Sequence, residues 1–254
     1  MSTAQTAVAP AGLGQSVALL VRWRVRSNAS QFPLLFAVQI AVSVLLVLGL
    51  GMFVGNPPEL FARYLTTGAG TAALLTVALI VTSQSVSQMK ENGSLAWMKT
   101  WPVARTALVL AEVTMWTALV LPGLVLGWII GAARFHVSIS PRPWIILVVL
   151  VVALTATSLG YSYAVLLHPQ IANVIGQLLT FVVLMFSPVS FPAERLPGWL
   201  QTIHHFLPIE PMAELMRAGV MPEAFSVTTR SVVVLTIWVV AAVGGAEASL
   251  RRRL

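Results

Sequence analysis

The 254-residue chain is 57% hydrophobic and 9% charged, with a formal net charge of +7 and a mean hydropathy of +0.88. A soluble domain has roughly 25% charged residues, so this composition excludes an ordinary water-soluble protein. The positive charge does not indicate a nucleic-acid-binding protein, because the lysines and arginines lie between apolar runs and not together on one face. The absence of cysteine also excludes disulfides and thiolate metal sites.

Residues 1–30 are predicted to form an N-terminal tail that ends in an interfacial helix. Apolar residues from Leu13 onward fall on one arc, and Arg22, Trp23 and Arg26 supply the basic and aromatic groups that such helices place at a membrane surface. Arg24 falls on the apolar arc, so we expect its long side chain to extend towards the headgroups. A loose basic arm is the alternative interpretation.

Residues 31–254 are predicted to form a single transmembrane domain. A helix that crosses a bilayer core of roughly 30 Å needs about 20 apolar residues. The stretches that meet this requirement are residues 32–54, 65–86, 106–130, 144–167, 171–189 and 227–247. Because backbone polar groups in lipid must be satisfied within the segment, each stretch is predicted to be helical. The predicted fold class is an all-α membrane protein with six transmembrane helices.

An even number of spans places both chain ends on one side of the membrane. Nine lysines and arginines flank the spans on that side, and six flank them on the other. The nine are Arg22, Arg24, Arg26, Lys90, Lys99, Arg105, Arg251, Arg252 and Arg253. Basic residues favour the cytoplasmic side, so we predict cytoplasmic termini in a multi-pass protein of the plasma membrane.

The loop between the second and third spans, residues 87–105, is too apolar for an idle linker. If residues 94–101 form a short helix, Leu95 and Met98 lie three positions apart, and Trp97 and Trp101 lie four apart. Pro102 then ends the helix. Such a helix rests on the lipid headgroups or docks against a soluble partner, and the pattern alone leaves both interpretations open.

The segment between the fifth and sixth spans, residues 191–225, is predicted to form two short helices on the outer side, which re-enter the membrane or lie flat on it. Glu210, Glu214 and Arg217 are spaced to meet along the second helix. His204 and His205 are adjacent, so on a helix they point about 100° apart and do not comfortably share a metal ion. No metal site is predicted.

Polar residues inside the spans are costly in lipid and usually face the bundle interior or a water-filled path. Gln84 and Gln88 lie one turn apart in the second span. One face of the fifth span carries Asn173, Gln177, Thr180, Phe181 and Met185. A substrate path and simple hydrogen bonding between helices are both compatible with this pattern.

The third span carries one carboxylate and a glycine repeat. Glu112, and Glu247 in the sixth span, lie near the cytoplasmic ends of their spans, so we expect these carboxylates to reach water or to pair with Arg105 or Arg251. The glycines recur every four residues, at Gly123, Gly127 and Gly131. This spacing predicts a face where another helix packs closely.

Two of these segments resemble loops of a known transporter family. The first carries Glu91, Gly93, Ser94, Leu95, Trp97, Met98, Thr100, Pro102 and Val103. The outer segment carries Leu196, Pro197, Gly198, Trp199, Leu200, Pro208, Pro211 and Arg217. With its six predicted spans and basic N-terminal helix, the chain resembles permease subunits of type-2 ABC exporters, of the multidrug- and daunorubicin-resistance kind, over almost its whole length. Trp101 departs from the family pattern, in which a smaller residue is usual at that position.

The resemblance implies that two permeases, identical or related, assemble in the lipid with two cytoplasmic ATP-binding cassette subunits. The loop around Trp97 would then be the coupling helix, with the N-terminal helix beside it, and the second and fifth spans would line the cavity. The residues implied at the outer gate are Trp199, His204, His205, Glu210, Glu214 and Arg217.

No GxxxxGK[ST] sequence occurs in the chain, so ATP and magnesium are expected on the partner subunit and no cofactor is expected here. The apolar lining favours a hydrophobic or amphiphilic substrate, such as a drug or a lipid. An intramembrane hydrolase and a non-transporting anchor subunit are the alternative functions.

Overall fold

The computed structural model describes residues 12–27, 29–30, 32–55, 57–98 and 100–251. Within these ranges the regular structure is helical, and no strand occurs. Some predicted positions lie outside the described residues, namely residues 1–11 of the N-terminal tail, Lys99, Arg252 and Arg253.

Six helices of the described chain are long and apolar enough to cross a membrane, so the predicted all-α, six-helix class is confirmed. The first, third and fourth are α2 (Phe32–Val54), α6 (Arg105–Phe135) and α7 (Ile145–Leu166). The fifth and sixth are α8 (Pro169–Phe186) and α11 (Thr229–Arg251). The second consists of α3 (Glu59–Thr76), the π-helical turn η1 (Val77–Val81) and α4 (Thr82–Glu91).

The second span is longer and more central than the predicted residues 65–86. It runs without interruption over 33 residues, and 83% of its most apolar stretch is buried inside the bundle. A helix of this length is about 50 Å long, which exceeds a bilayer core of roughly 30 Å. At least one end of it therefore extends past the apolar layer.

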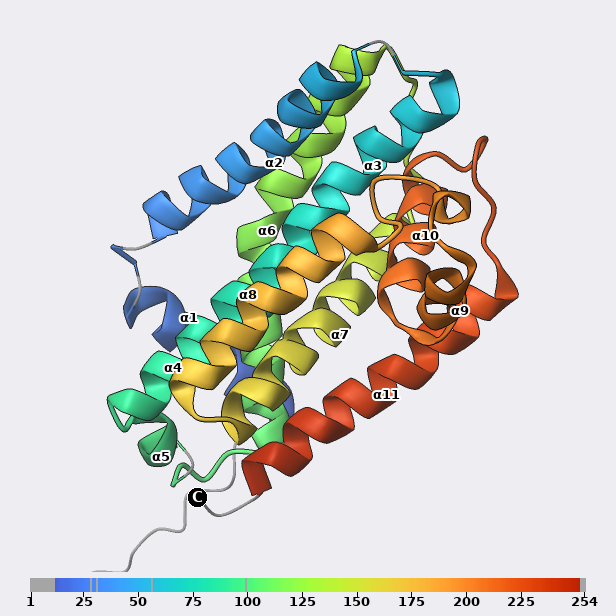
Figure 1. Ribbon diagram of the computed structural model, residues 1–254. Helices are drawn as coiled ribbons and strands as arrows, with labels where there is room; N and C mark the ends of the chain where they lie inside the picture. The colour runs from blue at the N-terminus through green and yellow to red at the C-terminus, as the bar shows by residue number, and fades with distance from the viewer. Residues whose placement is uncertain (1–11, 28, 31, 56, 99, 252–254) are drawn as a thin grey trace, which may run out of the picture.

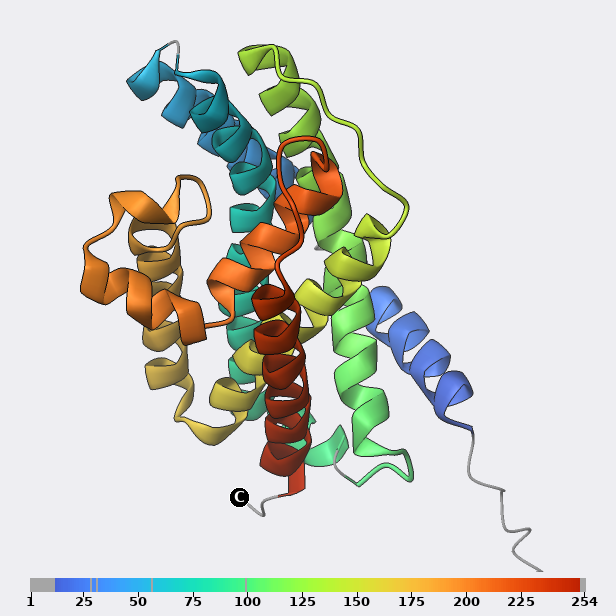
Figure 2. The same ribbon diagram turned by 90° about the vertical axis from the view of Figure 1, so that its right-hand side faces the viewer.

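The bundle is arranged around the second span and α6 (Figures 1 and 2). Helix α6 packs against α1, α2 and α3, while α8 packs against α4 and α11 packs against α7. In α2, α8 and α11, only 17–22% of the most apolar stretch of each helix is buried. The outer faces of these three helices are therefore available to lipid or to another subunit.

The glycine repeat of α6 lies where helices approach closely, as predicted. A Cβ atom added to Gly131 would lie 2.9 Å from the Cα atom of Thr66 in α3. At Gly127 the nearest atom would be the Cα of Gly70, at 3.4 Å. Small residues thus allow the backbones of α3 and α6 to come together.

The helices that do not span the membrane lie towards the two ends of the bundle. Helix α1 (Leu13–Ser27) and helix α5 (Ser94–Met98) lie at the same end as the last turns of α11, which we call the α5 end (Figure 1). Three short elements lie towards the other end, here called the α10 end: η2 (Ala193–Arg195), α9 (Gly198–Phe206) and α10 (Ile209–Val220).

Candidate functional site

Helix α5 has one buried and one exposed side. Gly93 adopts a left-handed backbone with φ of 74°, which turns the chain after α4, and the side chain of Asn92 accepts a hydrogen bond from the backbone nitrogen of Ser94. Leu95 and Met98 are 1% and 3% exposed and join a core cluster with residues of α1, α4, α6 and α7. Helix α5 is thus fixed to the bundle along one side.

The predicted helix over residues 94–101 is shorter than expected, because it ends at Met98. The Thr100 hydroxyl donates to the carbonyl oxygen of Trp97 at 2.7 Å, and Trp101 follows in a bend. A residue before proline avoids the α conformation, so Trp101, which precedes Pro102, cannot readily continue the helix. Glu91 is exposed at the end of α4.

Three tryptophans from α1 and from the α5 region meet at the surface. The ring centroids of Trp97 and Trp101 are 4.8 Å apart, and Trp23 lies 5.3 Å from Trp101 and 6.4 Å from Trp97. Trp97 is 56% exposed, and Arg22 and Arg26 beside this cluster are exposed as well. The structure therefore joins α1, the predicted interfacial helix, and α5, the candidate coupling helix, through one aromatic cluster.

Helix α1 is attached to the bundle by a buried ion pair. Arg24 is 7% exposed and pairs with Glu112 of α6, which is 3% exposed and also accepts a hydrogen bond from the indole nitrogen of Trp116 at 3.1 Å. The expectation that Arg24 extends to the headgroups was wrong, and so was the pairing of Glu112 with Arg105 or Arg251. The apolar arc of α1 faces protein and not lipid, so Arg24 is buried with it.

Polar side chains connect α4 to α7 and α8 near the α5 end. Ser83 donates to the carbonyl oxygen of Ala172 at 3.1 Å, and Ser87 donates to that of Pro169 at 3.4 Å. The ammonium group of Lys90 donates to the carbonyl oxygens of Val165 and Leu167 at the end of α7. Movement of α4 is therefore coupled to the turn between α7 and α8.

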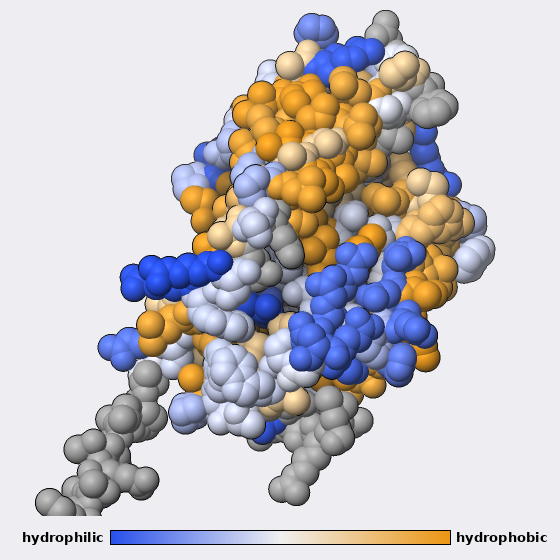
Figure 3. Space-filling model, turned by 90° about the vertical axis from the view of Figure 1, so that its left-hand side faces the viewer, coloured by the Kyte–Doolittle hydropathy of each residue, from blue (hydrophilic) through white to orange (hydrophobic). Residues whose placement is uncertain are grey.

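The residues predicted to line a substrate path lie on two elements that contact each other. Gln84 and Gln88 of α4 are exposed and line a small cavity of about 120 Å³ with Phe32, Met115 and Trp116. Hydrophilic residues gather over part of this side of the molecule, towards the α5 end (Figure 3). Their role in transport stays a prediction.

On α8 the predicted stripe is partly buried. Gln177 is exposed, Asn173 is half-buried and Thr180 is 5% exposed. The side-chain oxygens of Asn173 and Thr180 are buried without a hydrogen-bond partner among the described residues. Phe181 and Met185 are 58% and 54% exposed, so the far end of the stripe is an apolar surface.

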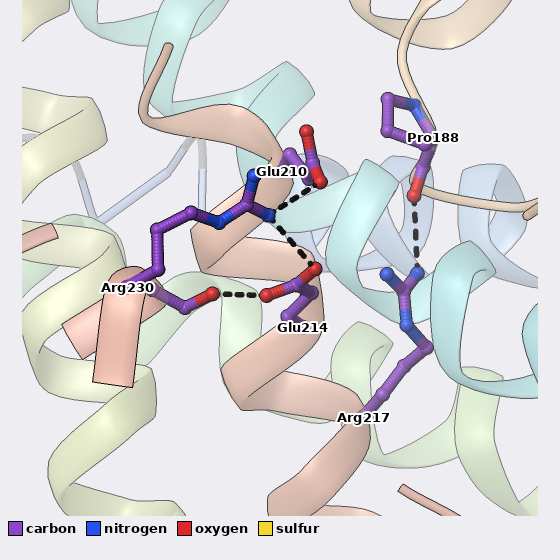
Figure 4. A network of polar contacts seen from close by, with 6 residues as sticks. Pro188, Glu210, Glu214, Arg217 and Arg230 are labelled. Carbon is purple, nitrogen blue, oxygen red and sulfur yellow. Dashed lines mark hydrogen bonds and ion pairs between the residues drawn. The ribbon is translucent and has the colours of Figure 1, made fainter. Parts of the chain in front are cut away.

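The two short helices predicted between the fifth and sixth spans are present as α9 and α10. The prediction that Glu210, Glu214 and Arg217 meet along α10 was wrong. Both glutamates pair with Arg230 of α11, at 2.8 and 3.4 Å (Figure 4). The sequence pattern missed Arg230 because its contact depends on how α11 returns to α10.

Arg217 points to a different part of the α10 end. It is 4% exposed, donates to the carbonyl oxygens of Pro188 and Val189 at 3.1 and 3.0 Å, and lies over the ring of Tyr64. Burial lowers the pKa of the Arg217 guanidinium, while Tyr64 and the nearby glutamates act in the opposite direction. This arginine holds the end of α8 against α10 and α3.

The two adjacent histidines differ in environment. His204 is 1% exposed, and its Nε2 atom lies 2.9 Å from the carbonyl oxygen of Phe186. Burial lowers the pKa of His204, although this hydrogen bond and Glu210 oppose the shift. His205 and Trp199 are exposed. Within the described ranges no group of three potential metal ligands occurs.

A comparison with protein families shows which family has this architecture. The family model of the ABC-2 type transporter matches residues 15–221, from α1 to the end of α10. No curated protein sequence matches the chain. Because the match extends over most of the chain and includes both the α5 region and the α9–α10 segment, the chain belongs to the ABC-2 type transporter family, as a multi-pass membrane permease.

Proposed function

We propose that the chain is the permease subunit of an ATP-driven exporter, with the α5 end in the cytoplasm and the α10 end on the outer side of the plasma membrane. An ATP-binding cassette subunit, which holds ATP and magnesium, docks on the surface formed by Trp23, Trp97 and Trp101. A second permease, identical or related, completes the path for a hydrophobic or amphiphilic substrate such as a drug or a lipid.

One observation carries this proposal, namely that α5 is anchored on one side and exposes tryptophan on the other. Aromatic side chains supply large contact areas at low entropic cost and dominate interface energies. Leu95 and Met98 are buried in the same cluster as Met89 of α4, so a force on Trp97 is transmitted to the second span. The hydrogen bonds of Ser83 to α8 and of Lys90 to α7 then transmit this force from α4 to those two helices.

The placement of α5 is tested by cysteine labelling, which is convenient because the chain has no cysteine of its own. Ala96→Cys lies on the exposed side of α5 and Thr202→Cys on the exposed side of α9. We expect a membrane-impermeant maleimide to label Thr202→Cys in intact cells and Ala96→Cys only after permeabilisation. Labelling of Ala96→Cys in intact cells, with Thr202→Cys labelled only after permeabilisation, would exclude docking of the ATP-binding subunit at the α5 end.

Export itself is tested with the complete complex. The chain is co-purified with a candidate ATP-binding subunit and reconstituted in lipid. We expect stable association and ATP hydrolysis that responds to the transported substrate. Hydrolysis that is the same with and without the permease would argue instead for a non-transporting anchor.

A further inference from the structure

A polar cavity of about 300 Å³ lies at the α10 end, between α3, η2, α9, α10 and the start of α11. Its charged lining residues are Glu194, Glu210, Glu214, Arg217 and Arg230. The carboxylates outnumber the guanidinium groups by one. The cavity therefore carries an excess of negative charge and favours a cation.

Three of the four carboxylate oxygens of Glu210 and Glu214 accept a hydrogen bond from a neighbouring side chain. Arg230 Nη2 donates to Oε1 of Glu210 and to Oε1 of Glu214, and the hydroxyl of Ser231 donates to Oε2 of Glu214 (Figure 4). Both oxygens of Glu214 are thus engaged. Arg217 is held by the carbonyl oxygens of Pro188 and Val189.

The exception is Oε2 of Glu210. Glu210 is 3% exposed, and this oxygen is buried without a hydrogen-bond partner among the described residues. A carboxylate oxygen only accepts hydrogen bonds, and a buried acceptor without a donor is unfavourable. A ligand that enters the cavity and donates to this oxygen would remove that cost.

The geometry points to an ammonium ligand: we propose that the cavity binds the protonated primary amine of a small molecule or lipid, with Glu210 Oε2 as its principal acceptor. An ammonium group has three donors. Gln201 uses its amide nitrogen on the carbonyl oxygen of Leu196, which leaves its amide oxygen as a second acceptor in the lining. Glu194, exposed on the wall, is a third. This site does not depend on the proposed export activity.

A divalent metal ion fits the same cavity less well. Such ions need several oxygen or nitrogen ligands around one point. The residues that the structure describes contain no group of three that could supply them. One buried carboxylate oxygen without a partner, with weaker acceptors beside it, suits a monovalent ammonium group.

The binding test uses the full chain in phosphatidylcholine nanodiscs, titrated with radiolabelled decylamine. Binding to nanodiscs without the chain is subtracted. We expect one saturable site per chain for decylamine and none for decanol, which has the same tail but no charge. Absence of saturable decylamine binding overturns the proposal.

Two competitors identify the source of the amine. Soluble ethanolamine displaces decylamine if the site accepts free amines, and phosphatidylethanolamine added to the discs displaces it if the site accepts a lipid headgroup. Either result supports an ammonium site. Displacement by neither overturns it, because the ammonium group is then not what the cavity recognises.

Variants connect the binding to Glu210. Glu210→Gln keeps the size of the side chain but can no longer present a charged oxygen, so we expect decylamine to bind about tenfold more weakly or worse, the effect usual for a charged hydrogen-bond partner. Glu223→Gln removes the same charge from an exposed residue outside the lining and should not change binding. Unchanged affinity in Glu210→Gln contradicts the proposal.

A second variant keeps the test decisive if Glu210→Gln fails to fold. Glu194 is exposed and outside the buried ion-pair network, so Glu194→Gln should fold normally. We expect a loss of several-fold in decylamine affinity. Unchanged binding in this variant would then refute the ammonium site.

Discussion

Arg24 in α1 and Glu112 in α6 form a buried ion pair across 88 positions of the sequence. Both side chains are withdrawn from solvent, so the two opposite charges compensate each other where water does not. The N-terminal helix is consequently fixed to the third span and does not simply float on the membrane. It also keeps Trp23 in contact with Trp97 and Trp101.

Breaking this pair should release α1. We expect Glu112→Gln to destabilise the docked helix by about 3–5 kcal/mol, because a buried arginine is left without its counter-charge. A Leu20→Cys reporter, at a position that is 4% exposed, should change from protected to reactive towards maleimide. The double variant Arg24→Met, Glu112→Leu should restore protection, since it removes both charges.

The matched control for that experiment is Glu59→Gln. Glu59 also pairs with an arginine, Arg63, but its side chain is 75% exposed. Exposed pairs of this kind contribute about 0–1 kcal/mol, so no change in Leu20→Cys reactivity is expected. Equal reactivity in the Glu59 and Glu112 variants would mean that the buried pair does not hold α1.

Trp97 and Leu95 should fail in different ways when changed to alanine. Trp97→Ala leaves α5 folded and is expected to weaken binding of the ATP-binding subunit by about 2 kcal/mol, near thirtyfold, with the permease itself unaffected. Leu95→Ala removes a fully buried side chain and should cost the permease about 2–5 kcal/mol of stability. The two effects are separated by measuring the affinity of each variant for the ATP-binding subunit and its thermal unfolding in detergent.

Trp199→Ala is the control for Trp97→Ala. Trp199 is 67% exposed, but it lies in α9 at the α10 end. The same loss of an indole there should leave the affinity for the ATP-binding subunit unchanged. An equal loss of affinity in both variants would show that the effect is not specific to α5.

Close packing between α3 and α6 should be sensitive to one added methyl group. Gly131→Ala places a Cβ atom 2.9 Å from the backbone of Thr66, so the helices must separate, at a cost of about 1–3 kcal/mol. Gly244→Ala in α11 meets nothing within 4 Å and should stabilise its helix by about 0.5–1 kcal/mol. Thermal unfolding should therefore move in opposite directions for these two substitutions.

His204 should make stability depend on pH. Because burial lowers its pKa, the folded state binds fewer protons than the unfolded state between the two pKa values. Above the unfolded-state pKa of about 6.5, His204 is neutral in both states and the folded state keeps its full stability. As the pH falls below that value, the unfolded state takes up a proton first, so the free energy of unfolding decreases.

The comparison that checks this is between His204→Gln and His205→Gln. Glutamine can still donate to the carbonyl oxygen of Phe186 but does not titrate, so His204→Gln should lose less thermal stability than the wild type between about pH 7.5 and 5.5. His205 is exposed, and His205→Gln should retain the wild-type pH profile. Identical profiles in all three proteins would remove His204 as the cause.

The predicted spans were found because a membrane helix needs only a long run of apolar residues. The second span was underestimated for a physical reason. Beyond Thr82 the helix becomes polar, yet Ser83 and Ser87 remain buried because they donate to backbone carbonyls of α8. Hydropathy along one segment does not register a hydrogen bond to another.

The sequence predicted the α5 region of the candidate site correctly but not the ion pairs at the α10 end. The buried Leu95 and the exposed Trp97 follow the helical spacing that the sequence indicated. Local spacing was misleading at the α10 end, where Glu210 and Glu214 pair with Arg230 and not with Arg217. Positions one turn apart can meet, but a buried charge pairs with whichever group the fold brings to it.

By itself, the sequence determined the membrane class, the helical fold and the position of the short helix around Trp97. These properties depend on segment hydropathy and on residues close together in the chain. The tertiary structure alone decided that Arg24 meets Glu112, that three tryptophans form one surface and that Glu210 keeps one oxygen unpaired. Those contacts join residues far apart in sequence, and only the packing of helices against one another brings them within reach.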